Sequence, residues 1–406
     1  MRYISILLFI FLLFSPFTSD AGALAAADYS VDPAPAAAAI NAFAIDVYHQ
    51  LAEESGNLFF SPYSISSALA MAYAGARGGT ADEMAKTLHF TGCEQEIHAA
   101  MKSLQNLYDS IPDEDGTFSV ANRLWTDEKV KLIPDYLELV TKNYGAGVKT
   151  VDFLNSHESA RLEINDWVAQ KTRDKIKDLL QENNVAPDTT QILVNAVYFN
   201  SIWQTPFDKN LTKEEQFRIG KDKQREVSMM RRTGYFLYGE NSLTQWIKIP
   251  YKIQGFSLVI FLPRENSAFT QLEELESKLT AEALTSWISE MRGLEAALSL
   301  PKFKDEHRYA LADVLQKMGM KLPFTNGADF SGMTETPQKI DSVIHQAFIE
   351  LDEERTEAAA ATAVAMVKTS IPLNPVIEFH VDHPFIYCLT DDTGTILFMG
   401  RLTDLN

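Results

Sequence analysis

The sequence predicts an α+β fold in one continuous domain, because stretches with helical spacing alternate with short apolar strands and nothing divides them. Ala36–Glu54 carries apolar residues at helical spacing, which indicates an amphipathic helix. Ile192–Phe199 is an almost unbroken apolar run, as expected of a strand that is buried on both faces. No repeat and no linker rich in Gly or Pro interrupts the chain. We therefore expect a single domain over residues 26–406.

The other expected elements are recognised in the same way, either by apolar residues at helical spacing or by short apolar runs typical of strands. Asn57–Ser66 indicates a short strand that turns into a helix. Thr80, with Glu83 three residues later, has the pattern of a capping box at the start of the next helix. Phe118–Trp125 is predicted as a strand and Leu162–Leu180 as a helix. A further helix is expected at Ala310–Met318, and further strands at Val227–Met230, Trp246–Pro250, Phe256–Pro263, Leu298–Phe303, Val376–Val381, Phe385–Leu389 and Ile396–Leu402.

The first residues have the pattern of an export signal. Arg2 supplies a positive charge, Ile4–Phe14 an apolar run, and Ala21–Ala23 or Ala23–Ala25 a small-residue cleavage site. The apolar run is too short for a spanning helix, and no longer one follows. We expect residues 1–25 to be removed and the mature chain to be secreted, in the extracellular space or the periplasm, without a membrane span.

Charge and motifs argue against several classes of function. The formal net charge is −19, whereas contacts to phosphate need clustered Lys and Arg, so no nucleic-acid partner is expected. The sequence has neither a G-x-S-x-G nucleophile elbow nor a phosphate-binding glycine loop. We therefore expect no enzyme activity and no cofactor.

The residues that most often bind metals are sparse. The chain has two cysteines, Cys93 and Cys388, and we expect Cys388 to be a buried free thiol because it follows an apolar strand. His380 and His383 lie three residues apart, so in an extended strand they point to opposite faces. No metal site is predicted.

The stretch Glu353–Ser370 has two interpretations. It contains a run of alanines, Ala358–Ala361, and no Pro or Gly. Alanine is the best helix former, so an alanine-rich surface helix is one interpretation. Alternatively, side chains this small at every second residue would let an extended segment slip between two existing strands. The stretch alone does not decide between them.

Motifs spread over nearly the whole mature chain resemble the serpin family, and their order and spacing make the match strong. The alanine run followed by Thr362-Ala363-Val364 is similar to that of bacterial members. The other motifs are Asn57–Ser66, Leu193–Phe207, Leu298–Phe303, Ala328–Gly332, Asp352–Thr362, His383-Pro384-Phe385 and Phe398–Arg401.

The resemblance implies a fold of three β-sheets with about nine helices and an exposed reactive-centre loop at about residues 353–375. It implies a suicide-substrate inhibitor: a protease cleaves the loop, and the loop then inserts into the central sheet and traps the acyl-enzyme. The implied partners are serine proteases of the trypsin-like, elastase-like and subtilisin-like classes, with cysteine proteases as a further class. A monomer is expected.

The resemblance also implies roles for particular residues. The sheet-opening region is placed at Ser61, Ser64, Asn195, Trp203 and His345. The hinge, where insertion begins, comprises Glu353, Arg355, Thr356, Glu357, Ala358, Ala359, Ala360, Ala361 and Thr362. The reactive bond lies within Val367, Lys368, Thr369 and Ser370, and the usual register of the family places it at Thr369–Ser370. Lys368 suits trypsin-like pockets and Val367 suits elastase-like ones.

The chain departs from the pattern of inhibitory members at one position. These usually carry Gly directly before the first inserting Thr, and this chain has Arg355 before Thr356. Glycine there allows an unusual backbone conformation at no cost in volume. The departure leaves open a second hypothesis, a non-inhibitory binding protein with the same fold whose loop is cleaved without trapping.

Overall fold

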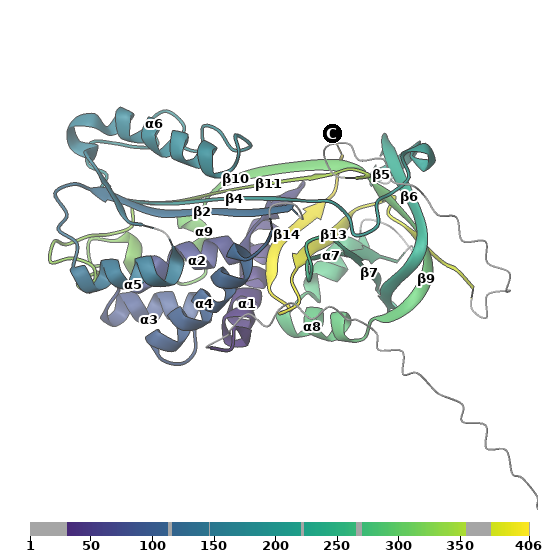
Figure 1. Cartoon of the computed structure of the whole chain (residues 1–406), viewed down its shortest axis with the longest axis horizontal. Coiled ribbons are helices and arrows are strands. Elements are labelled where there is room, and N and C mark those ends of the chain that lie inside the picture. Colours follow the sequence, from purple (N-terminus) through teal and green to yellow (C-terminus); the bar gives the residue numbers. More distant parts are fainter. Residues whose placement is uncertain are drawn as a thin grey trace, which may run out of the picture.

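A five-stranded sheet runs the length of the molecule and positions the candidate site (Figure 1). The computed structural model describes residues 31–112, 116–145, 147–220, 223–264, 270–354 and 375–405. The sheet consists, in spatial order, of β10 (Phe303–Ala310), β11 (Ser342–Leu351), β4 (Gln191–Ser201), β2 (Gly116–Asp127) and β3 (Lys149–Val151). The central strands β11 and β4 run parallel to each other.

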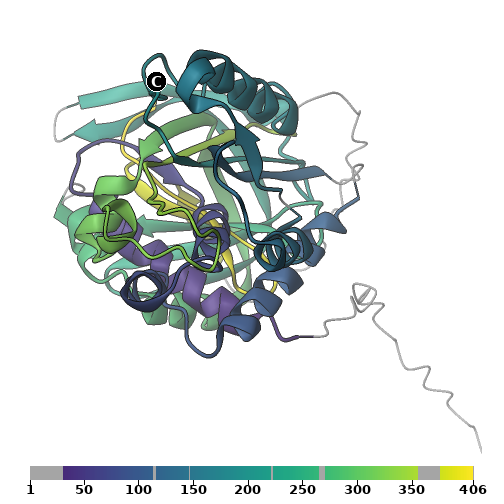
Figure 2. The same cartoon turned by 90° about the vertical axis from the view of Figure 1, so that its left-hand side faces the viewer.

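Helices cover both faces of this sheet, so β4 is buried on both, as its apolar run predicts. One side carries α1 (Ala34–Leu51), α2 (Pro62–Tyr73), α3 (Gly78–Thr87), α4 (Glu94–Asp109) and α5 (Pro134–Tyr144), and the other carries α6 (Phe153–Lys171) (Figures 1 and 2). Alternate residues of β4 belong to different apolar cores: Leu193 and Val197 pack on the larger one, Val194 and Tyr198 on the one beneath α6.

The remaining strands form a second hydrogen-bonded network of nine strands. Its order is β1 (Leu58–Phe60), β14 (Ile396–Leu402), β13 (Phe385–Thr390), β8 (Ser257–Pro263), β7 (Thr244–Pro250), β6 (Lys223–Glu240), β9 (Arg292–Pro301) and β12 (Ile377–His380), with β5 (Lys213–Gly220) beside β6. Shorter helices are α7 (Thr270–Ser277), α8 (Ala281–Ser289) and α9 (Ala312–Lys317), with single 3-10 turns at Lys209–Leu211 and Leu322–Phe324.

The α+β fold class is confirmed, with nine α-helices among the described residues. The three expected sheets appear as two hydrogen-bonded networks, because β6 is 18 residues long and is shared. Its first part pairs with β5, its middle with β9 and its last residues with β7, so two of the expected sheets are continuous.

The predicted capping box at Thr80 is wrong. The helix α3 already begins at Gly78, which places Thr80 inside it. Thr80 Oγ1 instead accepts a hydrogen bond from the backbone N–H of Asp329 (2.9 Å). Glu83 Oε2 accepts hydrogen bonds from the backbone N–H groups of Lys321 and Leu322, each at 2.6 Å. Both side chains fix a segment distant in sequence, which no local pattern could reveal.

The helix predicted at Leu162–Leu180 lies earlier in the chain. Asp152 caps α6 by accepting a hydrogen bond from the backbone N–H of Asn155 (2.9 Å), and the helix ends at Lys171. Arg173 and Asp174 adopt positive φ angles of 52° and 59°. A right-handed helix cannot continue through that conformation.

The two cysteines are both free thiols, Cys93 exposed and Cys388 buried, in agreement with the prediction for Cys388. None of the described helices is both long enough and apolar enough to cross a membrane.

Candidate functional site

A row of polar residues crosses the five-stranded sheet. The strand register places His345 of β11 opposite Asn195 of β4, and Asn195 opposite Asn122 of β2. His345 Nδ1 donates a hydrogen bond to Asn195 Oδ1, and the Asn195 amide donates to Asn122 Oδ1 and to Ser64 Oγ, the last at 2.6 Å. Ser64 Oγ also donates to Asn122 Oδ1 (3.2 Å), so hydrogen bonds connect three strands through side chains.

The start of α2 ties this row to the rest of the fold. Ser61 is the N-cap residue, and its Oγ accepts from the backbone N–H of Ser64 (3.2 Å) while donating to the carbonyl of Leu397 on β14 (2.6 Å). The Ser-Pro sequence suits this position, since Pro62 lacks the N–H that a first helical turn cannot pair. We call Ser61, Ser64, Asn122, Asn195 and His345 the polar cluster.

His345 is held neutral by its surroundings. Its Nε2 accepts a hydrogen bond from the backbone N–H of Ser61 (3.0 Å), while its Nδ1 donates to Asn195, so both ring nitrogens are satisfied without a positive charge. The side chain is fully buried. Burial disfavours the charged imidazolium and lowers the pKa of His345 to about 3.

We expect the stability of the protein to depend on pH through His345. The unfolded chain binds a proton at this residue below its ordinary pKa of about 6.5, while the folded chain does not until pH falls to about 3. The free energy of unfolding therefore falls as pH falls through this window, by up to about 1.4 kcal/mol per pH unit. Urea denaturation at pH 7, 6 and 5 measures this slope.

His345→Gln should flatten that slope, whereas His380→Gln, at a histidine whose side chain is 45% exposed, should leave it as in the parent. Equal slopes for the parent and His345→Gln would show that His345 is not the titrating group.

The two central strands separate at the end of the sheet that leads to the hinge. Their pairing runs from Ser342 opposite Ile192 to Phe348 opposite Tyr198 and then stops. Beyond it, Ile349–Leu351 of β11 stay paired with β10, and Phe199–Ser201 of β4 stay paired with β2. Each strand thus keeps its outer neighbour and loses its inner one, which leaves the sheet open at this end.

Trp203 lies at this open end. Its indole N–H donates to the backbone carbonyl of Asp352 (2.8 Å), directly after β11. Its ring stacks on Tyr251 with centroids 4.5 Å apart, and its side chain is 2% exposed. The tryptophan thus fixes the point at which the chain leaves the sheet.

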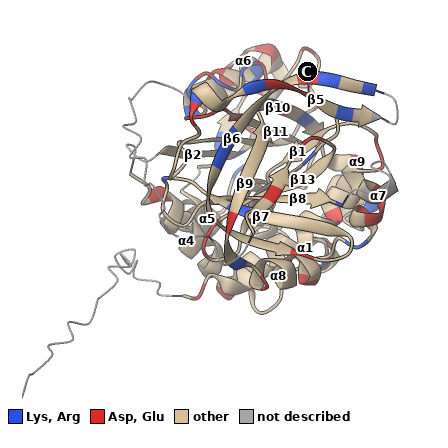
Figure 3. Ribbon diagram, turned by 90° about the vertical axis from the view of Figure 1, so that its right-hand side faces the viewer, with Lys and Arg blue, Asp and Glu red and all other residues tan. Residues whose placement is uncertain are grey.

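Glu353 provides a second anchor, and it is 3% exposed. Its carboxylate pairs with Lys302 Nζ (2.7 Å) and accepts a hydrogen bond from Thr212 Oγ1 (2.6 Å). Its backbone carbonyl accepts from the N–H of Phe207 (2.9 Å). Burial on its own would raise the pKa of Glu353, but the hydrogen bonds from Lys302 and Thr212 outweigh it and lower the pKa. Figure 3 views this end of the molecule, with Lys and Arg along β5 and β6.

The structure thus brings Ser61, Ser64, Asn195 and His345 into one cluster and places Trp203 apart from it, beside Asp352. Asn122 was not predicted from the sequence, because Ser119 and Arg123 of the same strand are polar as well and nothing local distinguishes the amide from them. Glu353 was predicted, but its pairing with Lys302 was not. The other predicted residues, Arg355, Thr356, Glu357, Ala358–Ala361 and Thr362 of the hinge and Val367–Ser370 of the reactive bond, lie outside the described residues.

Residues 38–405 match the family described as Serpin (serine protease inhibitor). The chain is 38% identical to leukocyte elastase inhibitor A of Rattus norvegicus, covering 89% of this chain and 97% of the relative. It is also 38% identical to an uncharacterized serpin-like protein of Methanosarcina acetivorans, over 92% and 88% of the two chains. Among solved structures it resembles uncleaved ovalbumin, with a TM-score of 0.81, 30% identity and coverage of 90% and 99%.

Proposed function

The chain belongs to the serpin family, and from this premise we propose that it is a suicide-substrate inhibitor of serine proteases. The target cleaves the reactive-centre loop, residues 353–375, which inserts between β11 and β4 before the acyl-enzyme is hydrolysed. The protein then acts as an inhibitor and not as an enzyme. The relative named leukocyte elastase inhibitor A supports a protease target.

One observation carries the proposal: the parallel pair β11–β4 is open at the end where the hinge begins. A chain that leaves β11 and turns back runs antiparallel to both β11 and β4. Insertion would therefore replace one parallel ladder by two antiparallel ones, which are somewhat more stable per residue. With about a dozen new ladder hydrogen bonds at ~1 kcal/mol each, insertion supplies on the order of 10 kcal/mol. A catalytic site tolerates little displacement, so this suffices to disrupt it.

The polar cluster supports the same proposal. The bond between His345 and Asn195 crosses the junction that must open, and a strand inserted there would separate the two residues. The cluster would hold β11 and β4 together until the loop is cleaved. Breaking its hydrogen bonds would then contribute to the energy barrier to insertion.

The test compares the intact chain with the chain cleaved once within the reactive-centre loop. Insertion should raise the melting temperature steeply, while a simple nick should not. A target protease should also form a complex with the chain that survives denaturing electrophoresis. Cleavage without either change would reject the proposal.

Arg355 favours a second candidate, a binding protein of the same fold whose loop is cleaved without insertion. An arginine at the start of the hinge should slow insertion, unless its guanidinium stays in water while its stem packs. Cleavage of the loop without a rise in melting temperature is the result that this candidate requires.

We expect two cleavage registers within the loop. Lys368 fits the acidic pocket of trypsin-like proteases and Val367 the small apolar pocket of elastase-like ones. Trypsin should therefore cut at Lys368–Thr369 and elastase at Val367–Lys368, because an exposed loop can present more than one bond. Mass spectrometry of the released C-terminal fragment should find starts at Thr369 and Lys368. A start at Ser370 with both proteases would contradict this.

The proposal also includes export. Arg2, the apolar run Ile4–Phe14 and the small residues after it have the pattern of a cleaved signal, so the targets would be proteases outside the cytoplasm.

A further inference from the structure

Two large apolar side chains of β6 are exposed at the end of the molecule where β6 and β9 run side by side (Figure 3). Tyr235 is 73% exposed and Leu237 is 44% exposed. They lie two residues apart in the strand, so both point to the same face of the sheet, while Phe236 between them points into the core. Single exposed apolar residues are normal, whereas a group of them indicates an interaction surface.

A shallow pocket lies beside these two side chains, because β6 and β7 diverge there. The β6–β7 ladder ends at Leu237, which lies opposite Lys248. The preceding residues of β6 are paired with β9, whereas β7 continues to Pro250 paired with β8. The gap has a volume of about 260 Å³, and its lining includes Tyr235 and Gly293.

Two features leave this pocket open to solvent. Gly293 lies opposite Leu237 in the β6–β9 ladder, and a Cβ atom added to it would have no atom of the described residues within 4 Å beyond its chain neighbours. Two residues further along β6, the same face meets Trp246, whose ring stacks on Trp287 of α8 with centroids 5.7 Å apart. The helix α8 therefore covers this face as far as Trp246 and leaves Leu237 uncovered.

This surface lies close to the point where the reactive-centre loop rejoins the fold. The strand β12 begins at Ile377, two residues after the loop, and it pairs with β9. The register places Glu378 of β12, Ala297 of β9 and Thr233 of β6 in one row across the sheet. Tyr235 follows Thr233 by two residues. With neighbouring strands about 4.8 Å apart and a rise of about 3.4 Å per residue, Tyr235 lies about 12 Å from Glu378.

A protease that binds the loop can reach this surface. The reactive bond is expected at Thr369–Ser370, seven residues before Ile377, and seven residues span at most about 25 Å. The bond is therefore at most about 37 Å from Tyr235. A protease domain of about 230 residues has a radius of gyration of about 17 Å and thus a width of about 45 Å. The protease is wide enough to contact both places at once.

We propose that the target protease docks at a second site on this surface, which we call the β6 face and which comprises Tyr235, Leu237, Lys248 and Gly293. The inference rests on the proposed function, since the loop brings the protease to this end of the molecule. An apolar side chain of the protease enters the pocket beside Tyr235, a residue type that contributes strongly at interfaces. An acidic side chain next to it pairs with Lys248, whose ammonium group lies 3.9 Å from Asp392, at the outer limit of an ion pair.

The small size of the β6 face fits a protease that the loop already holds. A contact added to a bound partner is intramolecular, so a few side chains suffice to strengthen binding. A second copy of the chain is the alternative occupant, but a stable dimer buries at least about 1,200 Å². Each copy also carries a formal net charge of −19, so two copies repel each other.

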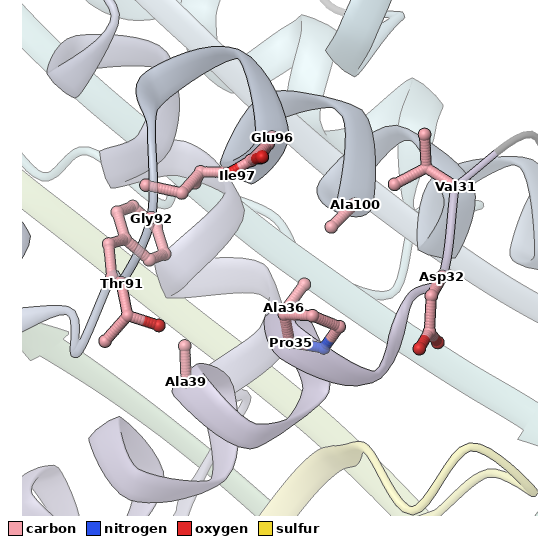
Figure 4. A pocket seen from close by; sticks show the side chains of 11 residues that line it. Val31, Asp32, Pro35, Ala36, Ala39, Thr91, Gly92, Glu96, Ile97 and Ala100 are labelled. Atoms are coloured by element: carbon pink, nitrogen blue, oxygen red, sulfur yellow. The ribbon is translucent and has the colours of Figure 1, made fainter.

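A larger apolar cavity elsewhere lacks this connection to the loop. It has a volume of about 430 Å³ and lies between α1 and α4 (Figure 4). Its two carboxylates already accept hydrogen bonds from backbone N–H groups: Asp32 from Ala34 (2.9 Å) and Glu96 from Cys93 (3.1 Å). The described residues that line it include none from β6, β9 or β12, so its place in the fold does not relate it to the protease.

The test uses the full mature chain with trypsin and with elastase, each with its catalytic serine replaced by alanine so that the loop is bound but not cut. Calorimetric titration measures the affinity. Tyr235→Ala/Leu237→Ala should weaken the binding of both proteases by about tenfold. Gly293→Val fills the pocket with a side chain that suits a strand, and it should weaken binding severalfold. Leu154→Ala/Leu162→Ala, which removes two similarly exposed leucines of α6, is the matched control and should bind as the parent.

Active protease separates this inference from the proposed function. In Tyr235→Ala/Leu237→Ala the rate constant of inhibition should fall by about tenfold, while the ratio of trapped to hydrolysed inhibitor stays that of the parent, because docking precedes the acyl-enzyme. If the parent traps the protease but this variant and Gly293→Val bind the inactive proteases as the parent does, the docking site is wrong and the proposed function stands. Weaker binding by the variants without trapping by the parent would keep the docking site and reject the inhibitor. Self-association of the parent in light scattering that the double variant abolishes would assign the β6 face to a second copy and overturn the proposal.

Discussion

A chain that carries Ala360→Pro is expected to be cut by its target protease without trapping it. If the hinge inserts between β11 and β4, position 360 lies in the middle of a six-stranded sheet, where proline removes a ladder hydrogen bond. Leaving one buried carbonyl unpaired costs about 1–3 kcal/mol, and 1.4 kcal/mol corresponds to a tenfold change. The ratio of trapped to hydrolysed inhibitor should fall by about tenfold or more. Titration of protease activity, with electrophoresis of the products, measures this ratio.

Thr356→Arg should have the same effect by another route, because it would bury a charge at an inward-facing position. Ala360→Ser is the matched control, since it keeps a small side chain and the backbone N–H. If both Ala360→Pro and Thr356→Arg trap the protease as well as the parent does, insertion of the hinge is not the mechanism.

Removing the cation beside Glu353 is expected to give the largest loss of stability. In Lys302→Met, the Glu353 carboxylate keeps the hydrogen bond from Thr212 but loses the ammonium group 2.7 Å away. The Glu353 side chain is only 4% exposed. Breaking a buried pair in this way costs about 3–5 kcal/mol, but the lysine side chain is 38% exposed, so we expect about 2–3 kcal/mol. Urea denaturation at pH 7 measures the loss.

The pH dependence that Glu353 contributes should also weaken in Lys302→Met. In the parent, the lowered pKa of Glu353 makes its contribution to stability fall as pH drops below the ordinary carboxyl pKa. In Lys302→Met the hydrogen bond from Thr212 still lowers the pKa of Glu353, but the contributions of Lys302 are lost, so this loss of stability at low pH should become smaller.

Two further variants test whether the stability loss in Lys302→Met comes from the buried ion pair. Glu353→Gln in the Lys302→Met background should recover part of the lost stability, because it removes the unpaired buried charge. Lys317→Met is the matched control: Lys317 and Glu53 also form an ion pair (2.9 Å), but both side chains are more than half exposed. It should cost less than about 1 kcal/mol. A loss from Lys302→Met no larger than that of the control would show that the buried pair is not an anchor.

The parts of the fold that could be predicted from the sequence are those that hydrophobic periodicity determines locally. Ile192–Phe199 was identifiable as a doubly buried strand, and Ile396–Leu402 is β14 with the same bounds. The length of β6 could not be predicted, because Arg231–Thr233 break the apolar pattern that marked only Val227–Met230. In the structure these residues remain in the strand because β9 pairs with them from a distant part of the sequence.

The same distinction applies to the candidate site. The dipeptide Ser61-Pro62 is enough to predict the start of a helix. That Asn122 lies beside Asn195 and His345 is shown only by the register of β11, β4 and β2. Thr80 and Glu83 looked like a cap because their spacing was right, yet their partners lie about 240 residues further on.

The parallel pairing of β4 and β11 has a consequence for how the molecule folds. Asn195 and His345 are 150 residues apart in the chain, so the central ladder forms only after a very large loop has closed. Folding that depends on contacts so distant in sequence is slow. Until β11 pairs with β4, one edge of β4 has unpaired backbone N–H and C=O groups. Under the proposed mechanism, the five-stranded arrangement is also not the most stable one that the chain can reach. The active form would then be the product of the order in which strands join, and its lifetime would be set by an unfolding barrier rather than by an equilibrium.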